Sequence, residues 1–428
     1  MSKQKMFVRS FIVSLVLVFS MGIFLSQVYA KVELKMYYPV GVAGPLAKLM
    51  NEMVGDYNKA QKEIYVEPIY AGSYREAMEK AQTAIMAGKP PAVAVLDAPV
   101  LLTLLDMDAI IPLDEYIEQE GGKTYVDTFV DAFMKIARHE GSIWSIPWQR
   151  STPVFYYNKD SFREVGLDPN KPPETWEDVV EYAKKLTKRD ASGKVVRWGV
   201  EIPINFWLLK PLILQSDGVL DNEPGTKVYF DTEPVREAFQ FLRRLAFEEK
   251  VMPAVREWGA SVSDFAAGAT AMLYNSTGAL TFIRKSTEYD FGTAFLPRHK
   301  KQLCIEGGGN FFIFKKTKKE KQDAAWKFIK WMTSPENAAK WSLGSGYVAV
   351  KKAAFEVPEY KEYLAKWPQA KTAFYQLEMA ERNMMTHRVN ELVDLVNRTI
   401  ERVMGGGDLD EALKDAQAKA DKILEKYQ

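Results

Sequence analysis

In the N-terminal part of the chain, segments with the hydrophobic pattern of a β-strand alternate with segments that have the pattern of an α-helix. Residues 32–38 and 64–70 are rich in β-forming side chains, and residues 92–96 form a third short apolar run. Between the first two runs, apolar side chains recur with the spacing of one helical face, at Leu46, Leu49, Met50, Met53, Val54 and Tyr57. Ser73 and Glu76 have the spacing of a capping box, which predicts the start of a second helix.

Strands that alternate with helices in this way predict a parallel sheet with right-handed crossovers. In such sheets, ligands bind beyond the carboxyl ends of the strands. Tyr38, Tyr74 and Asp97 end or follow the three predicted strands. We therefore expect these three side chains to lie at one binding site.

The alternation restarts after a break at Ile146–Pro153, which contains two prolines. Residues 154–158 predict a strand, and Thr175 predicts the N-cap of a helix that runs through Leu186. The middle of the chain predicts further elements, with helices at 234–248 and 277–285 and strands near 271–274 and 291–295.

A second break at Leu296–Gln302 is basic and turn-like. The glycines at 307–309 predict a turn or linker that leads into a strand at 310–314. The remaining pattern is helical, with predicted helices at 319–332, after Ser334 and on both sides of the glycines at 405–407. The whole pattern predicts two α/β lobes joined by several crossings.

Composition narrows the class of protein. The chain has 428 residues, of which 47% are hydrophobic and 26% charged, the balance of a soluble protein with two domains. Its net charge of +1 disfavours nucleic acid as a partner, because phosphate binding needs a concentrated basic face. The single cysteine, Cys304, excludes an internal disulfide framework and a multi-cysteine metal site. The three histidines have no metal-ligand spacing, so neither a metal nor a cofactor is expected.

The N-terminus indicates export. A basic start precedes an apolar stretch at 11–25, and residues 28–30 resemble a signal-peptidase site. We expect residues 1–30 to be a signal peptide and the mature protein to be periplasmic or extracellular. A lipid anchor is not expected, because no cysteine lies near this junction. The alternative is that the apolar segment is retained as a membrane anchor.

Candidate chemistry comes mainly from aromatic residues. No hydrolase elbow, phosphate-binding loop or zinc helix is present, so no catalytic residue is predicted. The chain contains 10 Trp, 20 Tyr and 23 Phe, and flat aromatic faces suit the C–H faces of sugar rings. Most such side chains belong to cores. The better candidates for a sugar site lie beside strand ends or breaks: Tyr38, Trp148, Trp207 and Tyr347.

The pair Tyr156-Tyr157 raises an alternative, because adjacent tyrosines bind ferric ion in some two-lobed binding proteins. In a strand, however, successive side chains point to opposite faces. The preferred interpretation of this segment is therefore an ordinary buried strand.

Four segments resemble a known family. Residues 151–160 (STPVFYYNKD) and 166–178 (GLDPNKPPETWED) are similar to the segment after the first hinge in family 1 extracellular solute-binding proteins of ABC importers. Residues 334–341 (SPENAAKW) and 345–355 (SGYVAVKKAAF) match the same family in the same order. The resemblance covers nearly all of the mature chain and is closest to the glycerol 3-phosphate-binding group.

The resemblance implies a two-lobed, type II-like binding-protein fold in which each lobe has a mainly parallel sheet flanked by helices. Lobe 1 would comprise residues 31–148 and 298–345, and lobe 2 residues 149–297 and 346–428. A ligand would bind between the lobes and pass to a membrane permease. Matched position by position, the implied ligand-binding residues are Tyr38, Tyr74, Asp97, Trp148, Arg150, Ser151, Trp207, Ser276, Gly307, Gly308 and Tyr347.

Two departures from the glycerol 3-phosphate group bear on the ligand. That group has an arginine near the start of the late helix, where this sequence has Val393, and Arg388 would match only after a shift. Arg150 replaces a small polar residue, so it supplies either a ligand-binding cation or a salt bridge across the hinge. We expect a mono- or oligosaccharide, with Asp97, Arg150 and Asn310 holding its hydroxyls or an anionic group. Glycerol 3-phosphate or a glycerophosphodiester is the alternative.

Two other classes stay open. A secreted glycan-processing enzyme would need two facing carboxylates, which sequence alone does not reveal. A surface adhesin is disfavoured, because the chain contains no repeats and no wall anchor. We expect a monomeric transport protein.

The predicted export signal has a direct test. After expression in a bacterial host that exports it, the mature protein should begin at Lys31, because signal peptidase cleaves after small residues such as Ala30. Intact-mass spectrometry of the purified protein measures this. A mature chain that begins before Lys31 would contradict cleavage at this site.

Overall fold

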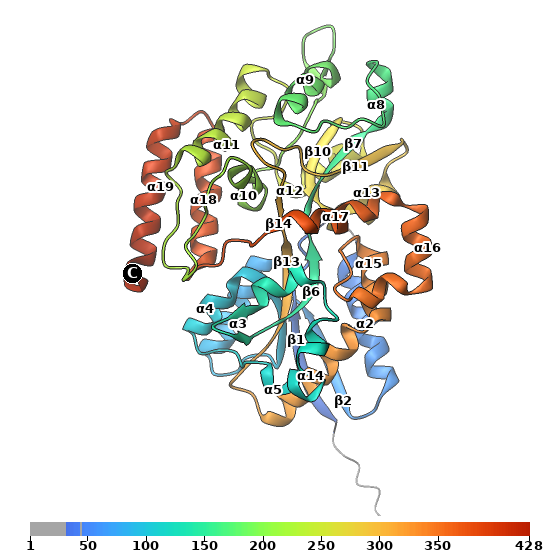
Figure 1. The fold of residues 1–428 in the computed structure, drawn as a ribbon, viewed down its shortest axis with the longest axis vertical. Helices are drawn as coiled ribbons and strands as arrows, with labels where there is room; N and C mark the ends of the chain where they lie inside the picture. Colours follow the sequence, from blue (N-terminus) through green and yellow to red (C-terminus); the bar gives the residue numbers. More distant parts are fainter. Residues whose placement is uncertain (1–30, 43–44) are drawn as a thin grey trace, which may run out of the picture.

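The computed structural model describes residues 31–42 and 45–428, and the predicted signal peptide lies outside the described residues. Two α/β halves lie one above the other in Figure 1, each with a central sheet and surrounding helices. The C-terminal helices α18 (Val389–Met404) and α19 (Leu409–Leu424) pack against each other along one side. The two-lobed α/β fold is as predicted.

The first sheet has the strand order β2-β1-β3-β13-β6. Strands β1 (Val32–Tyr38), β2 (Ile64–Tyr70) and β3 (Val93–Asp97) are parallel, as the alternating pattern predicted. Helices α2 (Leu46–Ala60) and α3 (Tyr74–Met86) connect them. The carboxyl ends of these strands therefore meet at one edge, which faces the other half of the molecule.

Local sequence signals fix where key helices begin. Ser73 Oγ accepts a hydrogen bond from the backbone N–H of Glu76, whose carboxylate accepts one from the backbone N–H of Ser73. Thr175 and Asp178 form the same box at the start of α9 (Trp176–Leu186). An N-cap contributes about 0.5–2 kcal/mol, enough to hold the first turn of α3 at the sheet edge.

Strands β13 (Gly307–Ile313) and β6 (Ile146–Ser151) complete the first sheet, and β13 is antiparallel to both of its neighbours. The prediction of a turn or linker at residues 307–309 is wrong, since all three glycines lie in β13. Gly308 has a φ of +92°, and a Cβ there would lie 1.7 Å from the carbonyl oxygen of Gln149. Close approach of two strands therefore requires glycine at this position.

The second sheet has the order β10-β7-β11. Strand β7 (Pro153–Asn158) leaves the hinge, whereas β10 (Met272–Ser276) and β11 (Phe291–Ala294) run back towards it. Both outer strands are therefore antiparallel to β7. The expectation of a mainly parallel sheet is wrong for this lobe, because its central strand enters directly from the first sheet.

The remaining elements surround these two sheets (Figure 1). The helices, in chain order, are α4 (Leu101–Asp106), α5 (Asp114–Gln119), α6 (Lys123–Val126), α7 (Asp131–Met134), α8 (Lys159–Glu164), α10 (Phe206–Gln215), α11 (Glu233–Arg243), α12 (Trp258–Ala266), α13 (Leu280–Ser286), α14 (Lys319–Met332), α15 (Pro335–Ser345), α16 (Pro358–Lys366) and α17 (Lys371–Gln376). The short strand pairs are β4 (Arg138–His139) with β5 (Ser142–Ile143), β8 (Lys188–Arg189) with β9 (Val195–Arg197), and β12 (Cys304–Ile305) with β14 (Ala380–Glu381).

The chain passes between the sheets at several points. Strand β6 continues almost directly into β7, and β12 leads into β13. A third segment lies beside them, since the backbone N–H of Val348 donates to the carbonyl of Arg150 over 2.8 Å. The predicted lobe boundaries stay a prediction. Residues 149–151 were predicted to begin lobe 2, and they pair with strand β13 of the first sheet. Arg298 was predicted to lie in lobe 1, and its backbone is hydrogen-bonded to Glu174 and Trp176 at the start of α9.

One buried ion pair joins two of these crossings. Arg150 Nη2 donates to Glu306 Oε2 over 2.6 Å, and the two side chains are 0% and 2% exposed. Arg150 Nη1 also donates to the carbonyl oxygen of Gly308 (3.0 Å) and to Asn310 Oδ1 (3.3 Å). The arginine is therefore engaged within the hinge, which corresponds to the salt-bridge alternative predicted for Arg150.

A second polar cluster connects α4 with the C-terminal helices. His387 Nδ1 lies 2.9 Å from both carboxylate oxygens of Asp106, and Tyr427 Oη donates to the same carboxylate over 2.8 Å. The His387 and Tyr427 rings stack with centroids 4.0 Å apart. The cluster ties the first sheet's helices to the C-terminal part of the chain.

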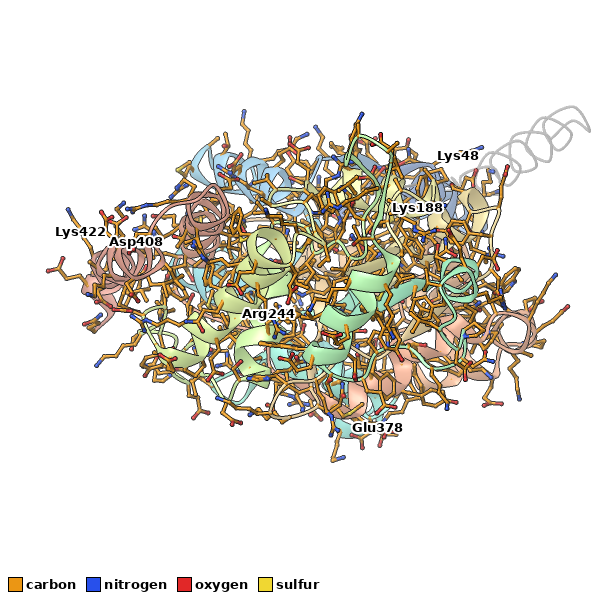
Figure 2. The ribbon with its side chains drawn as sticks, turned by 90° about the horizontal axis from the view of Figure 1, so that it is seen from above. Lys48, Lys188, Arg244, Glu378, Asp408 and Lys422 are labelled. Atoms are coloured by element: carbon orange, nitrogen blue, oxygen red, sulfur yellow. The ribbon has the colours of Figure 1, made fainter. Side chains whose placement is uncertain are left out.

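The outer surface is highly charged. Side chains such as Lys48, Lys188 and Lys422 project outwards (Figure 2). Within the described ranges, no helix is long and apolar enough to cross a membrane.

The hinge ion pair predicts a large, specific stability loss. Replacing Glu306 by alanine (Glu306→Ala) leaves the Arg150 cation buried without its counter-charge, and should lower the free energy of unfolding by about 3–5 kcal/mol. Urea denaturation measures this. Glu356→Ala removes the exposed ion pair with Lys361 and should cost less than about 1 kcal/mol. Equal losses for the two variants would contradict the assigned role of the hinge pair.

Candidate functional site

A cavity of about 450 Å³ lies between the elements of the two sheets. Small-molecule sites commonly occupy roughly 300–1,000 Å³. The cavity walls come from the strand ends of the first sheet, the hinge, and the helices α10, α12 and α18. The lining residues are Gly41, Val42, Ser73, Tyr74, Arg75, Asp97, Pro99, Ser151, Asn205, Trp207, Lys210, Trp258, Ser276, Gly308, Tyr347, Asn383, Val389, Asn390, Val393, Asp394 and Asn397.

Two tryptophans form an aromatic corner of the cavity. The Trp207 and Trp258 ring centroids are 5.8 Å apart, with an interplanar angle of 58°. Asn205 caps α10 by accepting from the backbone N–H of Trp207 (2.8 Å), and Trp207 Nε1 donates to the carbonyl oxygen of Glu306 (3.3 Å). These contacts hold the Trp207 ring in one orientation, which leaves an aromatic face for an apolar part of a ligand.

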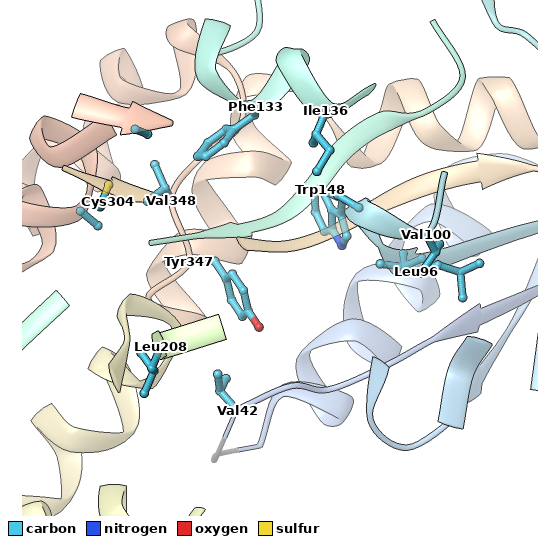
Figure 3. Packing of buried hydrophobic residues seen from close by; sticks show 14 of the residues in the cluster. Val42, Leu96, Val100, Phe133, Ile136, Trp148, Leu208, Cys304, Tyr347 and Val348 are labelled. Carbon is cyan, nitrogen blue, oxygen red and sulfur yellow. The ribbon is translucent and has the colours of Figure 1, made fainter. Parts of the chain in front are cut away.

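Two tyrosines, Tyr74 and Tyr347, also line the cavity. A Cβ on Gly41 would lie 2.7 Å from Cε2 of Tyr74 and 3.7 Å from Oη of Tyr347, so both rings pack beside this glycine. Tyr74 Oη donates to Gln149 Oε1 over 3.0 Å. Burial raises the pKa of Tyr347 to about 12, so its hydroxyl stays protonated at neutral pH. The Tyr347 ring projects towards Val42 (Figure 3).

Two oppositely charged side chains lie in the cavity. Burial raises the pKa of Asp97 to about 6, although the nearby charges of Lys210 and Arg150 favour its ionised form. Burial lowers the pKa of Lys210 to about 8, and the charge of Asp97 opposes that change. Lys210 Nζ donates to Asn383 Oδ1 over 2.8 Å. Asp97 ends β3 of the first sheet and Lys210 belongs to α10, so the two charges come from different lobes.

A further ion pair spans the cavity edge. Arg75, in the first turn of α3, places Nη1 3.3 Å from Asp394 Oδ1 of α18 and donates from Nε to Glu79 over 2.9 Å. Since Arg75 is already engaged by two carboxylates, it is a weaker candidate for binding an anion than Lys210. The pair connects the lobes beside the site.

Seven predicted ligand-binding residues line this cavity. They come from strand ends of both sheets, α3, α10 and the hinge, and are Tyr74, Asp97, Ser151, Trp207, Ser276, Gly308 and Tyr347. Their contact with a ligand stays a prediction.

Five other predicted residues lie outside the lining. Tyr38 is fully buried and its Oη donates to Asn51 Oδ1 (2.8 Å). Trp148 lies in the hinge core (Figure 3), and its ring centroid is 5.5 Å from that of Phe311 and 5.5 Å from that of Trp341. These aromatic side chains follow the strand alternation into the core rather than towards the cavity.

The other three residues, Arg150, Gly307 and Asn310, contact the hinge or the side chains that line the cavity. Asn310 Nδ2 donates to Ser145 Oγ over 2.8 Å, and its Oδ1 accepts from Arg150. A Cβ on Gly307 would lie 2.4 Å from the ring of Trp207, so this glycine makes room for the tryptophan. Hydrogen bonds within the protein engage both Nη atoms of Arg150 and the side-chain amide of Asn310. Contact of Arg150, Gly307 and Asn310 with a ligand stays a prediction.

Sequence reasoning did not select several lining residues. Lys210 is the one charged residue in the apolar helix FWLLKPLILQ. A lone charge in such a helix is a sequence signal that could have identified Lys210 as a functional residue. Asn383, Asn390 and Asn397 carry no local signal, because their positions depend on how α18 and the segment before it pack against α10.

The ferric-ion alternative gains no support from the tyrosine pair. Tyr156 Oη donates to the carbonyl oxygen of Ser276 over 2.8 Å, and the Tyr157 ring packs on Phe162. In the part of the chain that the structure describes, no group of three or more His, Cys, Asp or Glu side chains could hold a metal ion.

A two-lobed α/β fold with a polar and aromatic cavity at its hinge is the arrangement expected of a solute-binding protein. The chain matches the family described as "Bacterial extracellular solute-binding protein" over residues 52–372. This chain therefore belongs to the bacterial extracellular solute-binding protein family, as its motifs predicted.

Several known proteins are similar to this chain in sequence or in structure. The sn-glycerol-3-phosphate-binding periplasmic protein UgpB of Brucella abortus is 29% identical over 417 residues, covering 92% of this chain and 94% of that protein. UgpB of Mycobacterium tuberculosis in complex with glycerophosphocholine has a TM-score of 0.80 at 24% identity, covering 93% of this chain and 99% of that one. The ABC substrate-binding protein Lmo0181 of Listeria monocytogenes in complex with cycloalternan has a TM-score of 0.81 at 21% identity, covering 92% and 100%. These likenesses support the fold.

The raised pKa of Asp97 predicts a pH-dependent stability. Between about pH 4 and pH 6 the folded protein holds more protons at Asp97 than the unfolded chain does, so this residue makes stability fall as pH rises. Asp97→Asn should therefore raise the free energy of unfolding at pH 7 by up to about 3 kcal/mol, a gain that vanishes below pH 4. Urea denaturation across this range measures it.

The exposed Asp108 provides the control. Asp108→Asn should leave the pH dependence of the wild type unchanged, because that carboxylate is mostly solvated. If Asp97→Asn shows the same pH dependence as the wild type, Asp97 is not held in a low-dielectric cavity.

Proposed function

We propose that this protein captures a mono- or oligosaccharide in the cavity between its lobes and delivers it to the permease of an ABC importer. The observation that carries the proposal is the composition of the cavity. The Trp207–Trp258 corner offers aromatic faces for the C–H face of a sugar ring, and Asp97, Lys210 and several asparagines surround it. Stacking plus directional hydrogen bonds to hydroxyls is the combination that a sugar requires.

The proposed action is closure around the ligand. Tyr74 and Asp97 belong to the first lobe, whereas Trp207 and Ser276 belong to the second. A ligand that contacts all four favours the closed arrangement by its differential affinity for that state. The closed, loaded protein is then the form that the permease receives. We further propose that it acts as an exported monomer that binds neither nucleic acid nor a cofactor.

Glycerol 3-phosphate or a glycerophosphodiester is the second candidate. The names of the UgpB relatives favour it. Against it, Val393 lines the cavity at the position where the glycerol 3-phosphate group has an arginine, and Arg75 is engaged by carboxylates. A phosphate needs a cation or several N–H donors, and Lys210 is a cation that lines the cavity. Asp97 lines the same cavity and its carboxylate would repel a phosphate, which makes a neutral sugar the better match.

A glycan-processing enzyme is the alternative from another class. Such an enzyme needs a free acid pair across the scissile bond. The lining carboxylates are Asp97 and Asp394, and Asp394 is paired with Arg75. Incubation with chromogenic glycosides and maltotriose should leave both intact.

Ligand binding has a thermal test. Mature protein is heated with separate neutral sugars, polyols, glycerol 3-phosphate, glycerophosphocholine and ferric ion. A ligand at one hundred times its Kd adds about 2.7 kcal/mol to stability, so a neutral sugar should raise Tm measurably. A rise with glycerol 3-phosphate or glycerophosphocholine alone would select the second candidate, and a rise with ferric ion alone would contradict both.

The cavity assignment is tested on the sugar that raises Tm. Trp207→Ala and Tyr347→Ala should each weaken its binding by roughly tenfold or more in calorimetric titrations, since each removes a ring that lines the cavity. Tyr375→Ala is the matched control, because Tyr375 is an exposed aromatic residue outside the cavity. Unchanged affinity in both cavity variants would refute the assigned site.

A further inference from the structure

Lys210 is a buried cation that the ligand-binding predictions did not include. Its side chain is 3% exposed, and it lines the cavity from α10, one turn after Trp207. Nζ donates one hydrogen bond, to Asn383 Oδ1 at 2.8 Å. Across residues 31–42 and 45–428, no carboxylate oxygen lies within the 4.0 Å of an ion pair from Nζ. Nζ also lies 4.8 Å from the centroid of the Phe206 ring, and the N–H capacity that neither this ring nor Asn383 uses is available to a ligand.

Asp97 is the complementary group on the first lobe. Its carboxylate lies in the same cavity, at the carboxyl end of β3. Among the described residues, no side chain donates a hydrogen bond to it. The Lys210 and Asp97 charges influence each other, since each opposes the pKa change that burial causes in the other. Both groups line the same cavity, from β3 and from α10, and no ion pair within 4.0 Å joins them.

A ligand between these two groups must satisfy both. The ammonium donates hydrogen bonds, whereas the ionised carboxylate accepts them. A hydroxyl group does both, so two neighbouring hydroxyls of a sugar can accept from Lys210 and donate to Asp97. A phosphate would be repelled by Asp97, and the Lys210 charge already interacts with the carboxylates of Asp97, Glu306 and Asp221.

We propose that Lys210 is a specificity-determining ligand-binding residue, and that with Asp97 it selects a neutral sugar by binding two adjacent hydroxyls from opposite lobes. This inference rests on the proposed function, which it deepens by naming the residue and the charge of the ligand. Because the paired hydroxyls bridge the lobes, the same contacts favour closure.

The test uses the mature chain and calorimetric titration with maltose, maltotriose, glucose, galactose, glucose 6-phosphate and glycerol 3-phosphate. The wild type should bind one of the neutral sugars more tightly than either phosphate. Lys210→Met and Lys210→Gln should each weaken that binding by roughly 10- to 100-fold, as expected for loss of a charged hydrogen bond. Asp97→Asn should act in the same direction. The double variant Lys210→Met with Asp97→Asn should lose less than the product of the single losses, because both contact one hydroxyl pair.

Lys351→Met is the matched control, since Lys351 is also buried but contacts Thr128 and the Phe129 ring, outside the cavity lining. It should leave sugar affinity unchanged, and thermal melts confirm that each variant folds. Sugar binding that survives both Lys210 variants would overturn this inference and leave the proposed function standing. Tighter binding of a phosphate that Lys210→Met abolishes would instead make Lys210 an anion site. A wild type that binds no member of the panel would count against the proposed function itself.

Discussion

The buried Arg150–Glu306 ion pair is the constraint on which the two-lobed arrangement depends. The charges come from two chain crossings, the end of β6 and the residue before β13, and separating them would leave a buried charge without a partner. The carbonyl oxygen of Glu306 meanwhile accepts from Trp207 Nε1 and Asn383 Nδ2. Glu306 therefore ties the hinge to two side chains of the cavity, which gives the binding site a fixed edge.

Around that fixed edge, the cavity draws its chemistry from both lobes. The first sheet contributes Asp97 from a strand end, and α10 of the second lobe contributes Trp207 and Lys210. Asp97 and Lys210 keep shifted pKa values because they are withdrawn from water, and such unrelieved burial costs stability in the empty protein. A ligand that completes their hydrogen bonds recovers part of that cost, which couples binding to closure.

The sequence predicted those features that depend on local signals. The capping boxes at Ser73 and Thr175 and the parallel β1–β3 strands are local patterns, and the strand-end rule placed Tyr74 and Asp97 in the cavity. The sequence does not show which way an aromatic side chain points. Tyr38 and Trp148 were therefore predicted to bind ligand, whereas in the structure both lie in the core. Lys210 meets Asn383 across 173 residues of sequence, a pairing that only tertiary packing creates. Gly308 was interpreted as a turn, because close strand contact leaves no trace in a single sequence.

The most direct measurement is a crystal structure of the mature chain with the neutral sugar that raises its Tm most. We expect one sugar molecule in the hinge cavity, stacked on Trp207, with adjacent hydroxyls bonded to Asp97 from one lobe and Lys210 from the other. A sugar bound outside this cavity, or one that contacts residues of a single lobe, would contradict it.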